Sequence, residues 1–324
     1  MTSARSGHQE RSDVLGRFAP SPSGRFHVGN IFASLVAALV ADKMVLRIED
    51  LDPDRSKQQF IDGVKRDLAW FGFEWVGDLV HQSAIERQDA YRAALSELEE
   101  AGLVYPCFCS RADLHSARAP HVGEEYVYQN TCKYLSEEER AARALVRDPA
   151  LRLDVRSASS VQFEDVFQGS CAYDLACCSG DFIIRRSDGI FAYQLAVVVD
   201  DAAYGINSIV RGVDLLASTP KQLFIQELLG YERPEYGHVP IFVDECGCKL
   251  SKRNADASLE YLIEQLHLGP REILGYLAFL GGLIPEFQPM DIDELRRYAD
   301  LSQIDGKQEV VWCAPDHSAM DARL

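Results

Sequence analysis

The sequence predicts an α/β protein in which helices alternate with the strands of a parallel sheet. The first observation is an apolar segment, residues 14–19, followed by a turn rich in Pro, Ser and Gly and by the helical segment VGNIFASLVAALVADK. The second is the apolar run at residues 44–48, which ends in acidic residues. The third is a return of the same alternation over residues 191–243. Ligands of such sheets bind at the carboxyl ends of the strands.

The turn before the first helix has the features of a phosphate-binding site. Backbone N–H groups and the positive end of the helix dipole attract anions at a helix N-terminus. Gly24 and Gly29 allow a close approach, while His27 and Asn30 supply side-chain donors. A strand–helix turn with a satisfied histidine is the alternative when the turn is taken alone.

The remaining elements follow from periodicity and turn residues. We expect a disordered tail (1–12), a main α/β domain (13–254) with an insertion at about 105–190, and a helical C-terminal region (255–324). Ser83 is a candidate N-cap. The expected helices are 55–71, 83–101, 136–147, 191–202, 219–230, 258–267, 270–282 and 291–300. The expected strands are 151–155, 161–167, 205–212 and 238–243, with a hairpin over 181–193 around a Ser-Asp-Gly turn.

Three of the nine cysteines lie in a loop-rich segment that has the spacing of a metal clip. Cys107 and Cys109 form a C-x-C pair, and Cys132 follows after a compact loop. Three thiolates suit Zn²⁺, and His121 is the chemically conventional fourth ligand. The alternative is three buried thiols without a metal. We interpret the C-G-C at 246–248 as a turn.

The formal net charge of −17, from 33 basic and 50 acidic residues, excludes indiscriminate RNA binding. An RNA partner would have to meet a local basic surface, and its binding would weaken with salt. We expect a cytoplasmic protein without a membrane-bound part, because the N-terminus is polar and no run of about eighteen apolar residues occurs.

Two distant motifs resemble the signatures of one family. SPSGRFHVGN, residues 21–30, and KLSKR, residues 249–253, are similar to the two signatures of class I aminoacyl-tRNA synthetases, and FAPSPSG is the spelling of their glutamyl branch. With DFIIRRSDGIFAYQLAVVVDD and IVRGVDLLASTPKQ, the resemblance covers residues 14–255. It implies a Rossmann-type nucleotide-binding catalytic domain with a zinc-containing insertion.

The resemblance also implies roles for individual residues. Glutamate would be activated by ATP, with Mg²⁺ accompanying the nucleotide. Glutamate binding is implied for Arg17, Phe18, Ala19, Pro20, Ser21, Glu49, Tyr193 and Arg211, in which the arginines hold the side-chain carboxylate and Glu49 the ammonium group. ATP binding is implied for His27, Gly29, Asn30 and Lys252, and catalysis for His27, Asn30, Lys249, Ser251 and Lys252. Val197 replaces an Asn of many full-length glutamyl enzymes, which should loosen the pocket.

Within the glutamyl branch, the chain most resembles the glutamyl-queuosine tRNA(Asp) synthetases. Tyr128 and Cys132 match their Y-x-x-x-C spacing, which implies Tyr128 rather than His121 as the fourth zinc ligand. AVVVDD and the short remainder after Arg253 agree with this resemblance. It implies a monomer that binds the anticodon stem-loop of tRNA(Asp) and transfers glutamate to queuosine at the wobble position.

Three alternatives stay open at this point. The first is a truncated glutamyl-tRNA synthetase that charges tRNA(Glu). The second is a non-catalytic tRNA- or adenylate-binding paralogue, which should have lost His27, Lys252 or the arginines. The third is a small-molecule nucleotidyltransferase with the same histidine motif, which the cysteine-containing segment and the glutamyl-type pocket disfavour.

Overall fold

The computed structural model describes residues 13–22, 24, 26–110, 113, 127–156, 160–250 and 254–315, so the predicted tail at 1–12 lies outside the described residues. The strands are β1 (Leu15–Phe18), β2 (Lys43–Ile48), β3 (Val80–His81), β4 (Val104–Cys107), β5 (Ala150–Leu153), β6 (Val161–Asp165), β7 (Gly169–Tyr173), β8 (Phe182–Arg185), β9 (Ser208–Gly212), β10 (Glu235–Val239), β11 (Ile241–Val243) and β12 (Glu309–Val311). The α-helices are α1 (Val28–Val40), α2 (Gln58–Trp70), α3 (Ile85–Glu100), α5 (Glu137–Ala144), α6 (Leu175–Cys178), α7 (Tyr193–Ala203), α8 (Thr219–Leu228), α9 (Leu259–Glu264), α10 (Pro270–Gly281) and α11 (Ile292–Tyr298).

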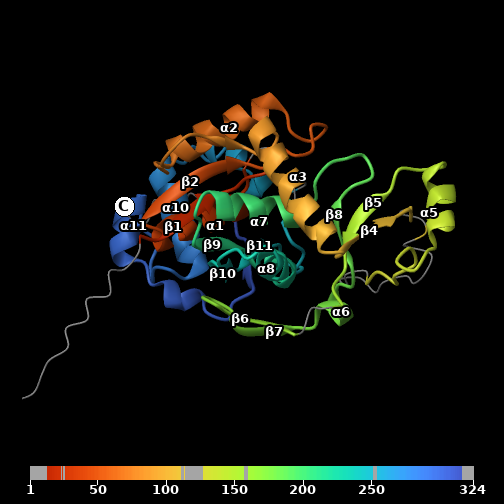
Figure 1. The fold of residues 1–324 in the computed structure, drawn as a ribbon. Helices are drawn as coiled ribbons and strands as arrows, with labels where there is room; N and C mark the ends of the chain where they lie inside the picture. Colours follow the sequence, from red (N-terminus) through yellow and green to blue (C-terminus); the bar gives the residue numbers. More distant parts are fainter. Residues whose placement is uncertain are drawn as a thin grey trace, which may run out of the picture.

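Two sheets adjoin in the larger body of the molecule (Figure 1). One has the order β1-β2-β3 and is parallel; in the other, β7-β6-β10-β9, β10 runs parallel to both β6 and β9. The N–H of Asn207, just before β9, donates to the carbonyl of Leu15 in β1 at 3.1 Å, which joins the two edges. The predicted parallel strands are therefore confirmed, and their carboxyl ends lie at one edge.

Helix α1 is amphipathic and forms the centre of one hydrophobic cluster. Its residues Val28, Ile31, Phe32 and Leu35 are fully buried and recur at helical spacing, so they share one face. The cluster includes residues of β1, β2, α10 and α11, whereas α3, α7 and α8 contribute to a second cluster. None of the described helices is long and apolar enough to cross a membrane.

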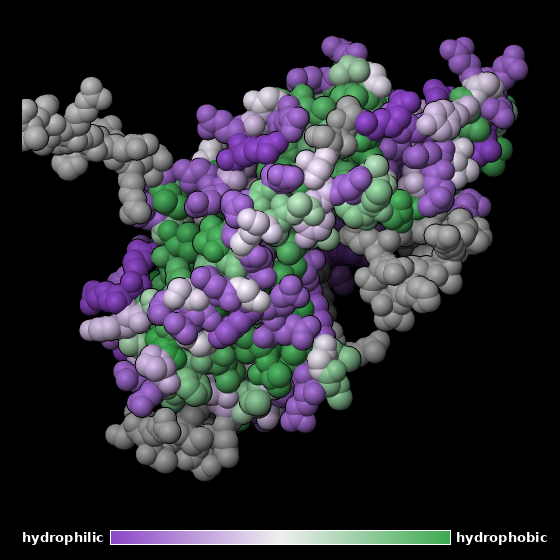
Figure 2. Space-filling model, turned by 90° about the horizontal axis from the view of Figure 1, so that it is seen from below, coloured by the Kyte–Doolittle hydropathy of each residue, from purple (hydrophilic) through white to green (hydrophobic). Residues whose placement is uncertain are grey.

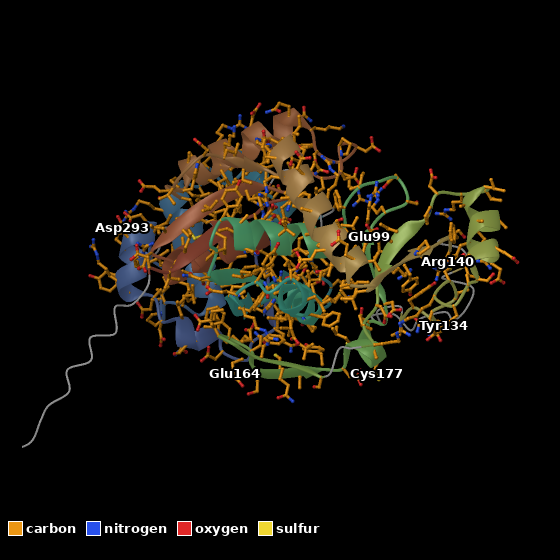
Figure 3. The ribbon with its side chains drawn as sticks, in the orientation of Figure 1. Glu99, Tyr134, Arg140, Glu164, Cys177 and Asp293 are labelled. Atoms are coloured by element: carbon orange, nitrogen blue, oxygen red, sulfur yellow. The ribbon has the colours of Figure 1, made fainter. Side chains whose placement is uncertain are left out.

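A smaller lobe stands at one end of the molecule. It contains α5 and the antiparallel sheet β4-β5-β8, and Figure 2 shows it projecting to one side of the larger body. Tyr134 and Arg140 lie on this lobe, at the opposite end from Asp293 of α11 (Figure 3). Strands β6 and β7 also belong to the range 105–190, but they extend the sheet of the larger body through β10.

Two local predictions are wrong. The N-cap of α3 is Ala84 rather than Ser83, because the Ser83 hydroxyl and N–H both donate to Asp50 instead. The predicted strand 238–243 is two strands, β10 and β11, which lie in different sheets on either side of Pro240. Proline has no N–H for a sheet ladder, so it separates the two pairings.

Two further predictions are correct only in part. Of the hairpin expected over 181–193, the structure keeps the turn and one bridge, Arg185 with Phe191, because Tyr193 already begins α7. The helices of the C-terminal region are present, but this region also supplies β12, which pairs with β11 in parallel. The pairing buries Trp312 against Phe242.

Gly275 of α10 provides a test of the packing between α10 and the segment before α11. A Cβ added at Gly275 would lie 1.9 Å from the backbone oxygen of Gln288, which cannot move like a side chain. We expect Gly275→Ala to lower the free energy of unfolding by roughly 1–3 kcal/mol or more. Urea denaturation measures this change.

The matched control is Gly63→Ala in α2, where the nearest atom would lie at 3.8 Å. This substitution should raise the free energy of unfolding by up to about 1 kcal/mol, because alanine favours a helix over glycine. Equal effects of the two substitutions would contradict the packing argument.

Candidate active site

A pocket of about 610 Å³ opens at the carboxyl ends of β1, β2, β9 and β10. This volume is typical of a site for a small molecule. The structure brings into its lining the described residues for which a substrate or catalytic role is expected: Arg17, Phe18, Ala19, Pro20, Ser21, His27, Gly29, Asn30, Glu49, Tyr193, Arg211 and Lys249. Ser251 and Lys252 lie outside the described residues. Val197 does not reach the lining; it is buried in the second hydrophobic cluster.

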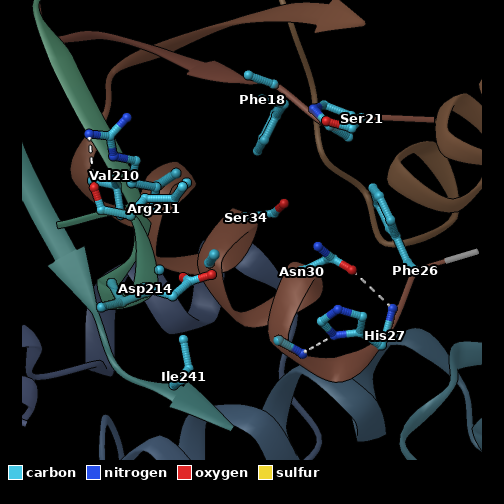
Figure 4. Close-up of a pocket in the computed structure, with 18 of the residues that line it drawn as sticks. Phe18, Ser21, Phe26, His27, Asn30, Ser34, Val210, Arg211, Asp214 and Ile241 are labelled. Atoms are coloured by element: carbon cyan, nitrogen blue, oxygen red, sulfur yellow. Dashed lines mark hydrogen bonds between the residues drawn. The ribbon is translucent and has the colours of Figure 1, made fainter. Parts of the chain in front are cut away.

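One wall of the pocket is the N-terminus of α1 (Figure 4). His27 is the N-cap: its Nδ1 accepts from the N–H of Gly29 at 3.1 Å, and its own N–H donates to Oδ1 of Asn30 at 3.2 Å. The Nδ1 contact places the proton of the neutral imidazole on Nε2. The imidazole and the helix dipole together form a wall that favours anions.

Arg17, Glu49 and Arg211 line the part of the pocket nearest the sheet. The side chains of both arginines are almost entirely buried, and Arg211 donates from Nη1 to the Tyr193 hydroxyl at 3.4 Å. Burial raises the pKa of Glu49 above its usual 4.5, while the guanidinium groups of Arg47 and Arg17 oppose that rise. Two cations beside one carboxylate suit a substrate that carries both carboxylate and ammonium groups.

A buried charge network holds these residues in place. Asp201 of α7 accepts from Nε of Arg17 at 3.3 Å and from Nη1 of Arg47 at 2.5 Å. Arg47 also contacts Glu49 at 3.3 Å, so β1, β2 and α7 are joined through charged groups. The neighbouring Asp200 accepts from Arg87 at 2.7 Å and lies 3.7 Å from Arg47.

The network is balanced in charge, since the guanidinium groups of Arg17, Arg47 and Arg87 face the carboxylates of Glu49, Asp200 and Asp201. Burial alone would lower the pKa of Arg47, but the three carboxylates around it raise that pKa instead. The carboxylates around it therefore hold Arg47 in its charged form although it is removed from water.

Lys249 also lines the pocket and forms an ion pair with Asp214 at 2.5 Å. Asp214 belongs to the 3₁₀ helix Val213–Ser218 that follows β9. Both side chains are partly exposed, so the pair is screened by solvent and can exchange for another anion. Lys249 is thus held in the lining of the pocket by a weak contact.

Sequence reasoning did not find Asp201, Asp214 or His238, which contacts Arg211. The acidic pair at the end of AVVVDD was a visible signal, because charged residues directly after an apolar helical face must find partners when that helix is buried. Asp214 and His238 had no comparable local signal.

The three cysteines of the expected clip meet in the smaller lobe. Their sulfur atoms lie within 4.8 Å of one another, and Cys109 Sγ is 3.6 Å from Cys132 Sγ. The Tyr128 hydroxyl lies 3.4 Å from Cys107 Sγ and 3.8 Å from Cys109 Sγ. Tetrahedral bonds of about 2.3 Å place ligand atoms about 3.8 Å apart, so the cluster fits a metal ion. His121 lies outside the described residues.

Asp201 provides a test of the charge network. Asp201→Asn keeps the shape of the side chain but leaves the buried guanidinium groups of Arg17 and Arg47 without their shared counter-charge. We expect the free energy of unfolding to fall by roughly 3–5 kcal/mol, the usual cost of breaking a buried ion pair from one side. Urea denaturation measures this loss.

The matched control is Asp188→Asn, which removes the charge from an exposed pair with Arg186. It should change the free energy of unfolding by less than about 1 kcal/mol. If both variants unfold at the same urea concentration as the parent chain, the network does not support the fold.

Residues 13–310 match the family described as "tRNA synthetases class I (E and Q), catalytic domain". Among curated proteins, the chain is 41% identical over 310 residues to the glutamyl-Q tRNA(Asp) synthetase of Geobacter sulfurreducens, covering 93% of this chain and 91% of that one. It is 42% identical over 293 residues to the protein of the same name from Nitratidesulfovibrio vulgaris, covering 85% and 89%.

The glutamate–tRNA ligase of Aquifex aeolicus is 38% identical over 308 residues, which cover 92% of this chain and 64% of that protein. Among solved structures, a glutamate tRNA ligase from Elizabethkingia meningosepticum in complex with its amino acid superposes with a TM-score of 0.77 at 23% identity, covering 94% of this chain and 68% of the other. That likeness shows the fold. Together with the family match, these findings show that the chain belongs to the class I tRNA synthetases of the glutamate and glutamine group.

Proposed function

We propose that this chain activates L-glutamate with ATP and transfers the glutamyl group to the queuosine base at the wobble position of tRNA(Asp). The observation that carries the activation step is a single pocket with Arg17, Arg211 and Glu49 at one end and the N-terminus of α1 at the other. The acceptor rests on the relatives named glutamyl-Q tRNA(Asp) synthetase.

In the first step, an α-carboxylate oxygen of glutamate attacks the α-phosphorus of ATP, and pyrophosphate leaves. Arg17 and Arg211 would hold the side-chain carboxylate and Glu49 the ammonium group, which directs the α-carboxylate toward α1. His27 and the first turn of α1 would stabilise the charge on the phosphoryl oxygens. Mg²⁺ bound with ATP supplies further neutralisation of the phosphates.

Lys249, with Ser251 and Lys252, would hold the pyrophosphate end of ATP. The pair between Lys249 and Asp214 is partly exposed, so the phosphate of an incoming ATP can replace the Asp214 carboxylate as the partner of the lysine. In the second step, a hydroxyl of the queuosine cyclopentene diol attacks the adenylate carbonyl, which forms a glutamyl ester and releases AMP.

A second candidate function is charging of tRNA(Glu), because the glutamate–tRNA ligase of Aquifex aeolicus is 38% identical. Both functions share the adenylate step and differ only in the acceptor. The experiment must therefore identify which RNA accepts the glutamyl group.

The test follows labelled glutamate into RNA in the presence of ATP, with tRNA(Asp) that carries or lacks queuosine and with unmodified tRNA(Glu). We expect label only on tRNA(Asp) with queuosine. Label on tRNA(Glu) would favour the charging function. Absence of glutamate-dependent exchange of pyrophosphate into ATP would contradict the activation step.

The variant that tests the activation step is His27→Asn. Asparagine also caps helices and should preserve α1. Its rate of glutamate activation should fall roughly 10²–10³-fold, the usual effect of losing one donor to a developing charge.

We further propose that the metal of the cysteine cluster is Zn²⁺, held by Cys107, Cys109, Cys132 and Tyr128. The buried tyrosine hydroxyl beside two of the sulfur atoms supports Tyr128 as the fourth ligand. A closed set of four protein ligands is typical of structural zinc, which would stabilise the smaller lobe.

Elemental analysis of the purified chain should give one zinc per molecule. Cys109→Ser should weaken zinc binding by more than the roughly 10–100-fold that follows loss of an outer partner, and should lower the melting temperature. Tyr128→Phe should weaken zinc binding in the same direction while His121→Asn should not; the reverse result would assign His121 instead.

A further inference from the structure

His238 of β10 is completely buried, and both nitrogen atoms of its ring have partners. Nδ1 lies 2.5 Å from Oδ2 of Asp165, and Nε2 accepts from Nε of Arg211 at 3.0 Å. A buried histidine beside a substrate-facing arginine is not required by the sheet, because any apolar residue would fill this position. The imidazole connects a carboxylate to Arg211.

Strand register creates this contact. In the parallel pairing of β9 with β10, Arg211 lies directly opposite His238, so both side chains project from the same face of the sheet. Asp165 is the last residue of β6, on the other side of β10. Its Oδ1 accepts from the backbone N–H groups of Phe167, Gln168 and His238 at 3.0–3.1 Å. The carboxylate is therefore held rigidly by the backbone.

The chemistry of the partners determines the protonation of His238. Arg211 can only donate, so Nε2 must carry a lone pair; an ionised Asp165 can only accept, so the proton is on Nδ1. Burial, aided by the Arg211 charge, lowers the pKa of His238 against the opposing effect of Asp165. Burial alone would raise the pKa of Asp165, but its contacts with His238 lower it. The imidazole is thus a neutral acceptor for Arg211.

The remaining contacts of Arg211 occupy Nη2, which donates to the Leu215 carbonyl at 3.4 Å as well as to Thr219, so a ligand in the pocket would meet Nη1. Nη2 donates to the Thr219 hydroxyl at 2.8 Å, which together with the Nε contact fixes the plane of the group. Nη1 lies near the Tyr193 hydroxyl, and both residues line the pocket. A guanidinium held at Nε and Nη2 cannot turn to suit a different ligand.

We propose that Asp165 and His238 are positioning residues that orient the Arg211 guanidinium and thereby set the preference of the pocket for a side-chain carboxylate. The inference rests on the proposed function, in which Arg211 binds the side chain of glutamate. An arginine of fixed orientation presents only N–H donors, which a carboxylate oxygen accepts, whereas the N–H of an amide opposes them. The Asp165–His238–Arg211 chain also makes the pocket depend on β6.

Two amide variants of His238 separate the role in orienting Arg211 from general stability. His238→Asn keeps a donor near the position of Nδ1 for Asp165 but loses the acceptor for Arg211. His238→Gln reaches the position of Nε2 and can present an acceptor to Arg211. The two substitutions are alike in polarity, so they should affect folding similarly. The matched control is Tyr105→Phe, which removes a buried hydrogen bond to Asp181 in the smaller lobe.

The measurement is glutamate-dependent pyrophosphate exchange, with kcat and the KM of each substrate determined separately. We expect His238→Asn to raise the KM for glutamate roughly 10–100-fold, the effect of leaving one buried donor unpaired. The KM for ATP should not change, and the preference for glutamate over glutamine should fall. His238→Gln should recover most of the affinity, and Tyr105→Phe should resemble the parent chain.

Three results would overturn the inference. An unchanged KM for glutamate in His238→Asn, with a parent chain that exchanges pyrophosphate, would remove the positioning role while leaving the proposed function intact. A parent chain that shows no glutamate-dependent exchange of pyrophosphate into ATP would overturn the proposed function, and this inference with it. If neither His238 variant folds, Asp165→Asn tests the same chain of contacts in the same assay, because it removes the carboxylate partner of His238 Nδ1. An unchanged KM for glutamate in that variant would also overturn the inference.

Discussion

The contact of Asp201 with both Arg17 and Arg47 joins two strands and a helix beside the pocket. Arg17 comes from β1, Arg47 from β2 and Asp201 from α7, and Arg47 continues the contact to Glu49. Because unpaired charges are costly away from water, none of these elements can shift without exposing a buried charge. The charged groups that line the pocket are therefore held in place by buried contacts.

The two pocket arginines are anchored in different ways, and the difference has an electrostatic consequence. Arg17 contacts the carboxylate of Asp201, which neutralises much of its charge locally. Arg211 contacts the neutral imidazole of His238 and the hydroxyl of Thr219, so its orientation is fixed without a directly bound counter-charge. In a low-dielectric site, Arg211 is consequently the stronger attractor of an added carboxylate.

Several local patterns predicted the fold correctly, and those that failed did so where a distant partner intervened. The turn before α1 and the face of that helix follow from Gly29, His27 and the apolar spacing alone. Ser83 satisfies the local rule for an N-cap, but its N–H and hydroxyl donate to the carboxylate of Asp50, 33 residues away, and the helix begins one residue later. A local rule has no access to such a competitor.

The sequence by itself determined the alternation of strands and helices, the residue types of the pocket and the cysteine spacing, because each is a pattern over a few neighbouring residues. Tertiary structure alone decided that Asp201 meets Arg17, 184 residues away, and that His238 meets Arg211. Those contacts depend on the order and register of β1, β9 and β10. A shift of one residue would turn the side chains to the opposite face of the sheet, and only packing of the whole core excludes it.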